Sequence, residues 1–176
     1  MSVPRLLPPG TQPGFLGPLA VPGDLWWVSR VPVPLAGMAY PRAGAFPALA
    51  HAGFGHLVCL TDDPAPYDAA PLSVTAIRLQ EMIVRRTPAD PDAEERRVHR
   101  AADDVVEHVA QGIGVAVHCH GGRGRTGTVL GCALVRLGHD PGTVVDWLHR
   151  VQRTRGRRGW PEQAWQASVV LAAPSH

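Results

Sequence analysis

The chain has 176 residues, of which 45% are apolar and 18% are charged, a balance that excludes a fully disordered chain and a coiled coil. Its 17 positive side chains are all arginine, and with 15 acidic residues the net charge is only +2, too small for a dedicated nucleic-acid binder. Three cysteines are an odd and small number, which favours a reducing compartment over a disulfide framework.

The first segment, residues 1–24, is rich in proline and glycine and lacks an unbroken apolar run. It predicts a flexible arm rather than a signal peptide. No stretch of about 18 residues is apolar and free of charge, so no transmembrane helix is expected. We therefore expect a cytoplasmic protein, monomeric by default, with a single domain over residues 25–176.

Short elements follow this arm. Residues 25–29 predict a first strand, after which proline, glycine and arginine break the chain as far as Ala43. Residues 43–52 predict a short helix that ends at a glycine. Two further strands are predicted over residues 56–60 and 73–79.

Longer elements occupy the second half. Asp90 is an N-cap candidate before Pro91, and apolar residues at helical spacing continue this helix to Gly112. A buried strand is predicted over residues 114–118. Three more helices are predicted to begin near Arg125, at Asp140-Pro141 and at Pro161. Strands that alternate with helices predict a three-layer α/β domain, with a central, mostly parallel sheet of about four to five strands and helices on both faces.

The segment from Val117 to Gly127 reads Val-His-Cys-His-Gly-Gly-Arg-Gly-Arg-Thr-Gly and combines a strand end, a glycine-rich loop and a helix start. Such a loop can surround an anion with backbone N–H groups, and the helix N-terminus adds positive potential. The same field favours the thiolate form of Cys119. Arg125 lies on the first helical turn, where its planar guanidinium can bind two phosphate oxygens. The alternative is a buried core cysteine beside a tight turn.

From His118 to Gly127 the chain resembles the HCxxGxxR[S/T]G signature of cysteine-based protein tyrosine phosphatases. Its length is similar to that of the dual-specificity branch, and its layout from Leu25 to about Leu171 resembles the kinase-associated phosphatase type and its bacterial relatives. The resemblance implies a phosphate-monoester hydrolase acting on phosphotyrosine, and on phosphoserine or phosphothreonine if the pocket is shallow. It implies a phosphorylated protein as partner, with no metal, cofactor or nucleic acid.

The same resemblance implies a role for each loop residue. Cys119 would be the nucleophile that forms a phosphocysteine intermediate. Thr126 would donate its hydroxyl to the sulfur, and His118 would orient the loop. The transition state would be stabilised by the phosphate-binding loop, formed by His120, Gly121, Gly122, Arg123, Gly124 and Arg125.

The leaving oxygen needs a proton, which in this family comes from an aspartate after the strand that precedes the long helix. Glu81 occupies the matching position and is one methylene longer. Asp90 and Asp92 are alternatives, although both also suit a helix start. Gln163 matches a glutamine that contacts the active-site water in the family, or is an ordinary first-turn residue.

Several alternatives stay open. His120 and Arg123 are basic at positions where lipid phosphatases of the superfamily are also basic, so a phosphoinositide is an alternative substrate unless both side chains face solvent. A rhodanese-like sulfurtransferase and a catalytically decayed phospho-binding module are further alternatives. A protective disulfide from Cys59 or Cys132 to Cys119 is also open, because the sequence does not supply the distance between them.

Overall fold

The computed structural model describes residues 3–11, 15–16, 19–20, 25–42, 44–82 and 86–175. The main sheet contains β3 (Trp26–Ser29), β4 (Leu35–Met38), β5 (Phe54–Cys59), β6 (Ser73–Ala76) and β7 (Gly114–His118). The helices are α1 (Ala45–His51), α2 (Pro91–Ala110), α3 (Gly124–Arg136), α4 (Pro141–Thr154) and α5 (Ala164–Leu171). Two short strands, β1 (Phe15–Leu16) and β2 (Leu19–Ala20), form a separate antiparallel pair.

The main sheet has the strand order β3-β4-β7-β5-β6. Strand β7 lies at its centre and runs parallel to both β4 and β5, while only the edge strand β3 is antiparallel to its neighbour. Strand β6 pairs in parallel with β5 at the other edge. The predicted α/β class with a mostly parallel sheet is therefore confirmed.

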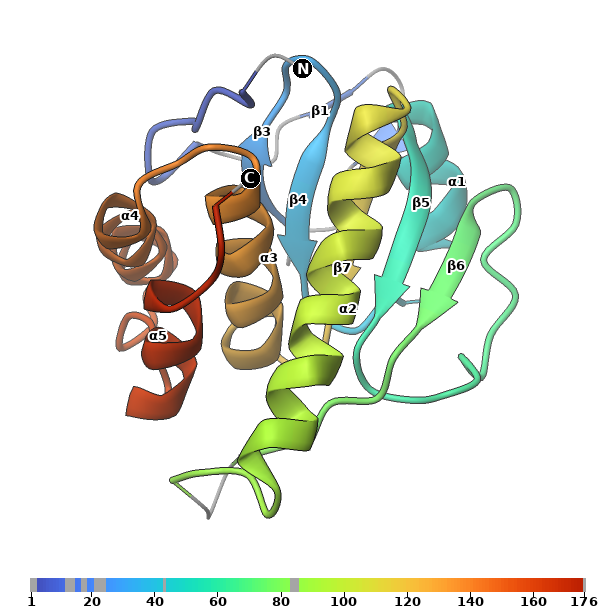
Figure 1. Cartoon of the computed structure of the whole chain (residues 1–176). Coiled ribbons are helices and arrows are strands. Elements are labelled where there is room, and N and C mark those ends of the chain that lie inside the picture. The colour runs from blue at the N-terminus through green and yellow to red at the C-terminus, as the bar shows by residue number, and fades with distance from the viewer. Residues whose placement is uncertain are drawn as a thin grey trace.

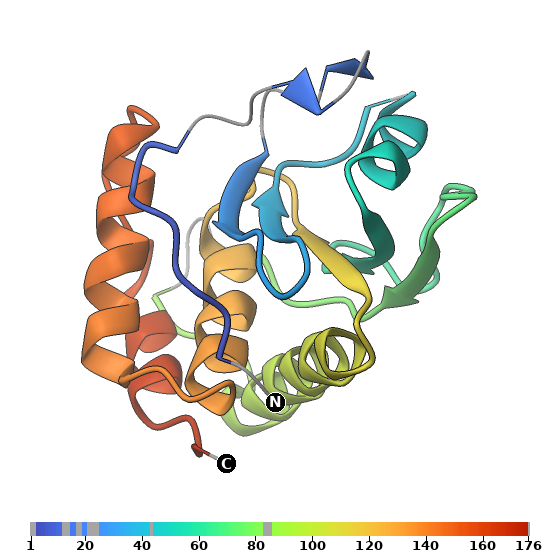
Figure 2. The ribbon, with the colours of Figure 1, turned by 90° about the horizontal axis from the view of Figure 1, so that it is seen from above.

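Helices cover both faces of this sheet. Helix α1 lies on one face, and α2 and α3 lie on the other, where α4 and α5 pack outside α3 (Figures 1 and 2). Two apolar clusters fill the space between the layers. Within β5, Val58 belongs to the cluster under α2 and α3, and Leu57 belongs to the cluster under α1. This alternation on a strand buried on both faces is typical of parallel sheets.

Strand β4 corrects the prediction that the chain is broken from residue 30 to Ala43. Prolines and Gly37 hide the strand, because both residue types are rare in strands. Gly37 has a packing reason, since a Cβ atom there would lie 2.3 Å from Cζ2 of Trp26. The absence of a side chain at Gly37 therefore lets the Trp26 ring cross the strand.

Two helix starts agree with the predicted caps. The Asp90 carboxylate accepts a hydrogen bond from the backbone N–H of Ala93 at 3.0 Å, and Asp140 caps α4 in the same way. The last helix begins at Ala164, three residues later than predicted, with Gln163 as its N-cap residue. Among the described residues, none of the helices is long and apolar enough to cross a membrane.

The predicted arm, residues 1–24, lies only partly within the described residues. Its described part from residue 3 to 11 runs along the domain. The Leu7 N–H donates to Val28 O at 2.9 Å, and the Trp147 indole donates to Leu7 O at 2.8 Å. The His139 ring donates to Pro4 O at 2.9 Å. This stretch is therefore tied to β3 and to the α3–α4 region, while flexibility in the rest of the arm stays a prediction.

Candidate active site

The glycine-rich loop joins β7 to α3 at the C-terminal ends of the parallel strands. Cys119 follows β7 directly, and its side chain is buried, with 3% exposed. Within the described chain, the backbone N–H groups of residues 120–125 donate to no acceptor. These groups and the N-terminus of α3 are therefore available to an anion.

Two buried tryptophans hold the loop from outside. The Trp26 indole N–H donates to the Gly122 carbonyl at 2.9 Å, and the Trp160 indole N–H donates to the Gly124 carbonyl at 3.3 Å. Arg155 adds a third bond, from Nη1 to the Gly122 carbonyl at 3.3 Å. With these carbonyls bonded to the surrounding fold, the loop can present its N–H groups to a ligand.

The backbone conformation at position 122 and its close contact with a neighbouring strand end require a glycine. Gly122 has a φ of +61°, and a Cβ atom there would lie 2.4 Å from the carbonyl carbon of Met38. Its neighbour Gly121 has open space around the equivalent Cβ position. Of these two glycines, only Gly122 is therefore sterically essential to the loop seen here.

Arg125 is anchored beside the loop by contacts to the chain around Glu81. Its Nη2 donates to Glu81 Oε1 at 3.1 Å, and its Nη1 donates to the Leu79 carbonyl at 3.2 Å. The Arg125 side chain is 10% exposed and the Glu81 side chain 46% exposed. The arginine is thus held in place, whereas the carboxylate has room to move.

A cavity of about 590 Å³ opens above Cys119. Its lining brings together Cys119 and Arg125 of the glycine-rich loop with Glu81 and Gln163, which come from two other segments of the chain. Gln163 also donates from Nε2 to the Met82 carbonyl at 3.3 Å, and so connects the start of α5 to the chain that carries Glu81.

The two alternative acids lie elsewhere. Asp90 is exposed and is used as the N-cap of α2. Asp92 is exposed in the first turn of the same helix. Neither lines the cavity above Cys119.

His118 and Thr126 are both completely buried next to the loop. His118 Nε2 is hydrogen-bonded to the Tyr67 hydroxyl, and the Tyr40 ring meets the imidazole edge to face. The Thr126 hydroxyl has no hydrogen-bond partner within the described chain, so in the free protein it is not bonded to the Cys119 sulfur.

All three cysteines are buried and free. Strand pairing places Cys59 opposite His118, next to the loop. Burial raises the pKa of the Cys59 thiol, but hydrogen bonds from His118, Thr61 and Tyr67 outweigh burial and lower the pKa to about 6. Burial raises the pKa of the Cys132 thiol to about 12.

The two basic loop residues are both occupied by protein contacts. The His120 ring stacks on the Tyr40 ring with a centroid separation of 5.7 Å. Arg123 donates from Nε to the Gly159 carbonyl at 2.8 Å and pairs with Glu162 at 3.5 Å. Arg123 nevertheless lines the cavity above Cys119, as does Arg158.

Sequence reasoning missed three contributors. From the sequence, Trp26 and Trp160 are expected only to pack in the core or at its rim. Arg158 lies in a basic run that is typical of solvated surface. Trp26 reaches a carbonyl 96 residues away, for which no local signal exists. Trp160 lies three residues before Gln163, and this closeness in sequence is the signal that could have indicated a place for Trp160 beside the site.

Comparison with known proteins agrees with this geometry. Residues 25–170 match the family model described as "Swiss Army Knife protein, DSP-PTPase phosphatase domain". The structure is similar to that of Tk-PTP in its active form, with 24% identity, a TM-score of 0.58, and coverage of 77% of this chain and 88% of that one.

Two other solved structures have the same fold. Kinase associated phosphatase with serine in place of its catalytic cysteine has 15% identity, a TM-score of 0.59, and coverage of 85% of this chain and 96% of that one. PTPMT1 in complex with PI(5)P has 16% identity, a TM-score of 0.56, and coverage of 78% of this chain and 87% of that one.

Proposed function

Because this chain belongs to the family of DSP-PTPase phosphatase domains, we propose that it hydrolyses phosphate monoesters through a phosphocysteine intermediate, with phosphotyrosyl proteins as its main substrates. One observation carries this proposal: Cys119, Arg125 and Glu81 line the same cavity, with unbonded loop N–H groups around it. A nucleophile, an oxyanion binder and a proton donor are the three parts that such a hydrolysis needs.

In the first step, the Cys119 thiolate attacks phosphorus, and the bond from phosphorus to the ester oxygen breaks. Arg125 and the N–H groups of residues 120–125 bind the three remaining oxygens as charge develops on them. Glu81 leaves its contact with Arg125, takes up a proton from solvent and gives that proton to the departing oxygen.

In the second step, water attacks the phosphocysteine, and the sulfur leaves as a thiolate. Glu81, now a carboxylate, accepts a proton from that water, with Gln163 at the same cavity to position it. The unpartnered Thr126 hydroxyl turns toward the sulfur and stabilises its negative charge. Inorganic phosphate is then released.

The runner-up is a phosphoinositide phosphatase with the same chemistry. Arg123 and Arg158 add positive charge to the cavity lining, and the similar protein PTPMT1 was crystallised with PI(5)P. The ion pair between Arg123 and Glu162 neutralises part of that charge, which favours a substrate with a single phosphate.

The experiment compares wild type, Cys119→Ser and Cys132→Ser on p-nitrophenyl phosphate, phosphotyrosyl and phosphoseryl peptides, and vesicles containing PI(5)P. We expect phosphotyrosyl peptides to be the best of the physiological substrates. Cys119→Ser should abolish turnover, whereas Cys132→Ser should retain it because Cys132 is packed inside α3 away from the cavity. Acid quenching during turnover should trap one phosphate per wild-type chain.

Undiminished activity in Cys119→Ser would overturn the mechanism. A clear preference for the lipid vesicles would instead favour the runner-up. Transfer of sulfur from thiosulfate to cyanide would favour a sulfurtransferase.

A further inference from the structure

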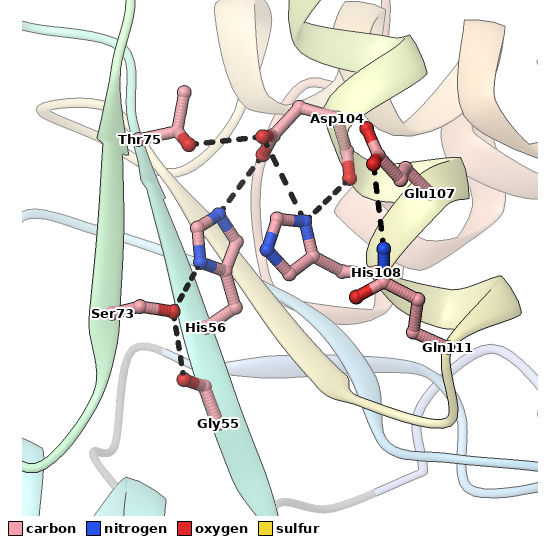
Figure 3. A network of polar contacts seen from close by, with 8 residues as sticks. All are labelled: Gly55, His56, Ser73, Thr75, Asp104, Glu107, His108 and Gln111. Atoms are coloured by element: carbon pink, nitrogen blue, oxygen red, sulfur yellow. Dashed lines mark hydrogen bonds and ion pairs between the residues drawn. The ribbon is translucent and has the colours of Figure 1, made fainter.

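A second cluster of chemically competent side chains lies away from the cavity, between β5 and α2 (Figure 3). It consists of His56, Asp104 and His108, each of which offers one ligand atom within 4.8 Å of the other two. His56 is on β5 and 2% exposed, and Asp104 and His108 are one turn apart on α2 with 18% and 20% exposed. Among the described residues, no other group of three or more His, Cys, Asp or Glu side chains converges in this way.

The hydrogen bonds around His56 are satisfied in a tautomer that leaves Nε2 free to ligate a metal ion. In the tautomer protonated at Nδ1, the Ser73 hydroxyl donates to the Gly55 carbonyl at 3.2 Å and its oxygen accepts from His56 at 2.7 Å. In the neutral ring, Nε2 then carries a lone pair, and it faces Asp104 Oδ2 at 2.9 Å. A metal ion bound by both atoms would take the place of the Nε2 proton that joins them in the other tautomer.

The remaining contacts have the form of an outer shell around a metal site. The Thr75 hydroxyl donates to Asp104 Oδ1 at 2.9 Å and orients the carboxylate. His108 Nδ1 donates to the Asp104 carbonyl at 2.8 Å, which leaves Nε2 as the unprotonated nitrogen. Ligating histidines and carboxylates usually have such second partners, which fix tautomer and orientation.

We propose that His56, Asp104 and His108 bind a divalent transition-metal ion, with zinc as the natural candidate, at a site separate from the catalytic cavity. Two imidazoles and one carboxylate suit zinc, cobalt or nickel rather than magnesium or calcium. If an ion were bonded at about 2.0–2.2 Å to both His56 Nε2 and Asp104 Oδ2, the N–metal–O angle would be about 90°, given the 2.9 Å between these two atoms. The His108 ring, now stacked on His56 at 3.6 Å, must tilt from this position to bring Nε2 to the ion.

The position of the site indicates a stabilising role. Strand pairing places His56 opposite Val115, three residues before the position where Cys59 meets His118. At about 3.3 Å per residue, the cluster lies about 10 Å along the sheet from the strand ends that carry the loop. A bound ion would join α2 to β5, and through the Thr75 and Ser73 hydrogen bonds to the edge strand β6.

The test uses the full chain, stripped with a chelator and then titrated with Zn²⁺ or Co²⁺. We expect one ion per chain by calorimetry, and a rise in Tm of roughly 5–10 °C at free Zn²⁺ of about 100 times Kd. Bound Co²⁺ should show ligand-field bands without a thiolate charge-transfer band. His108→Gln and Asp104→Asn should each weaken binding at least about tenfold.

The matched control is His99→Gln. His99 and Glu95 form another acid–histidine pair one turn apart on α2, at 3.3 Å, but lack a third ligand, so this variant should bind zinc as wild type does. Binding should also persist in Cys119→Ser.

Absence of stoichiometric binding would overturn the proposal. So would unchanged binding in His108→Gln, or loss of binding in Cys119→Ser, which would place the ion at the catalytic thiol. None of these outcomes depends on the phosphatase activity.

Discussion

The Arg125 guanidinium donates to the Glu81 carboxylate at 3.1 Å, so the side chains proposed to bind the phosphate and to protonate the leaving group contact each other in the free protein. A dianionic phosphate at Arg125 competes with that carboxylate. Glu81 is the more exposed partner, and we therefore expect it to be the one that moves when substrate enters.

Glu81→Gln separates binding from proton transfer. We expect kcat on an alkyl phosphate to fall about 100- to 10,000-fold, because the amide has no acidic proton to give. Affinity for tungstate, a phosphate mimic, should not fall, because the competing negative charge is gone. Steady-state kinetics and inhibition constants measure the two effects.

Asp90→Ala is the control for this prediction. It removes the N-cap of α2 and should cost about 1 kcal/mol of stability with kcat unchanged. Loss of activity in Asp90→Ala together with normal activity in Glu81→Gln would move the acid role away from Glu81.

The loop glycines should differ sharply when replaced by alanine. Gly122→Ala places a methyl group against the Met38 backbone at a positive φ, and we expect it to cost roughly 2–4 kcal/mol and most of the activity. Gly121→Ala adds a methyl group in open space, and it should change stability by less than about 0.5 kcal/mol. Urea unfolding and kcat/KM measure both. Equal behaviour of the two variants would contradict the loop geometry.

Trp26→Phe tests how the loop is held. It keeps most of the buried ring but leaves the Gly122 carbonyl without its indole donor, so we expect about 1–3 kcal/mol of lost stability and a lower kcat/KM. Trp147→Phe removes an indole bond to Leu7, away from the loop, and should lower stability without lowering kcat/KM. A Trp26→Phe enzyme with full activity would show that Arg155 alone holds that carbonyl.

Cys59 should link stability to pH. Its pKa is about 6 in the folded protein and, like an ordinary cysteine, about 8.5 when unfolded, so unfolding takes up a proton between these values. The stabilising contribution is complete above about pH 8.5 and is lost as the pH falls through about 6. Stability relative to Cys59→Ser should therefore rise from about pH 6 to about pH 8.5 in urea unfolding.

Cys132→Ser is the matched control for this pH series. Burial raises the pKa of the folded Cys132 thiol to about 12, so this residue affects the pH dependence only where the unfolded thiol ionises, near pH 8.5 and above. Below about pH 8 this variant should therefore follow the wild-type pH dependence. A wild-type slope that persists in Cys59→Ser would assign the effect to the histidines instead.

Much of this protein follows from the sequence because the deciding residues are neighbours along the chain. Cys119 and Arg125 are six residues apart on one strand–loop–helix unit, so their motif lies within a short stretch of sequence. The caps Asp90 and Asp140 are equally local, since each side chain bonds a backbone N–H three residues away. Patterns of this range are readable without knowing the rest of the fold.

Tertiary structure decided the contacts that join distant segments. The order β3-β4-β7-β5-β6 places separate segments beside the loop that follows β7. This allows Glu81 to meet Arg125 across 44 residues and Trp26 to reach Gly122 across 96. It also made a strand of residues 35–38, because pairing on both sides and the space at Gly37 outweigh weak local propensity. These contacts depend on which strands lie side by side, and a local pattern carries no record of that order.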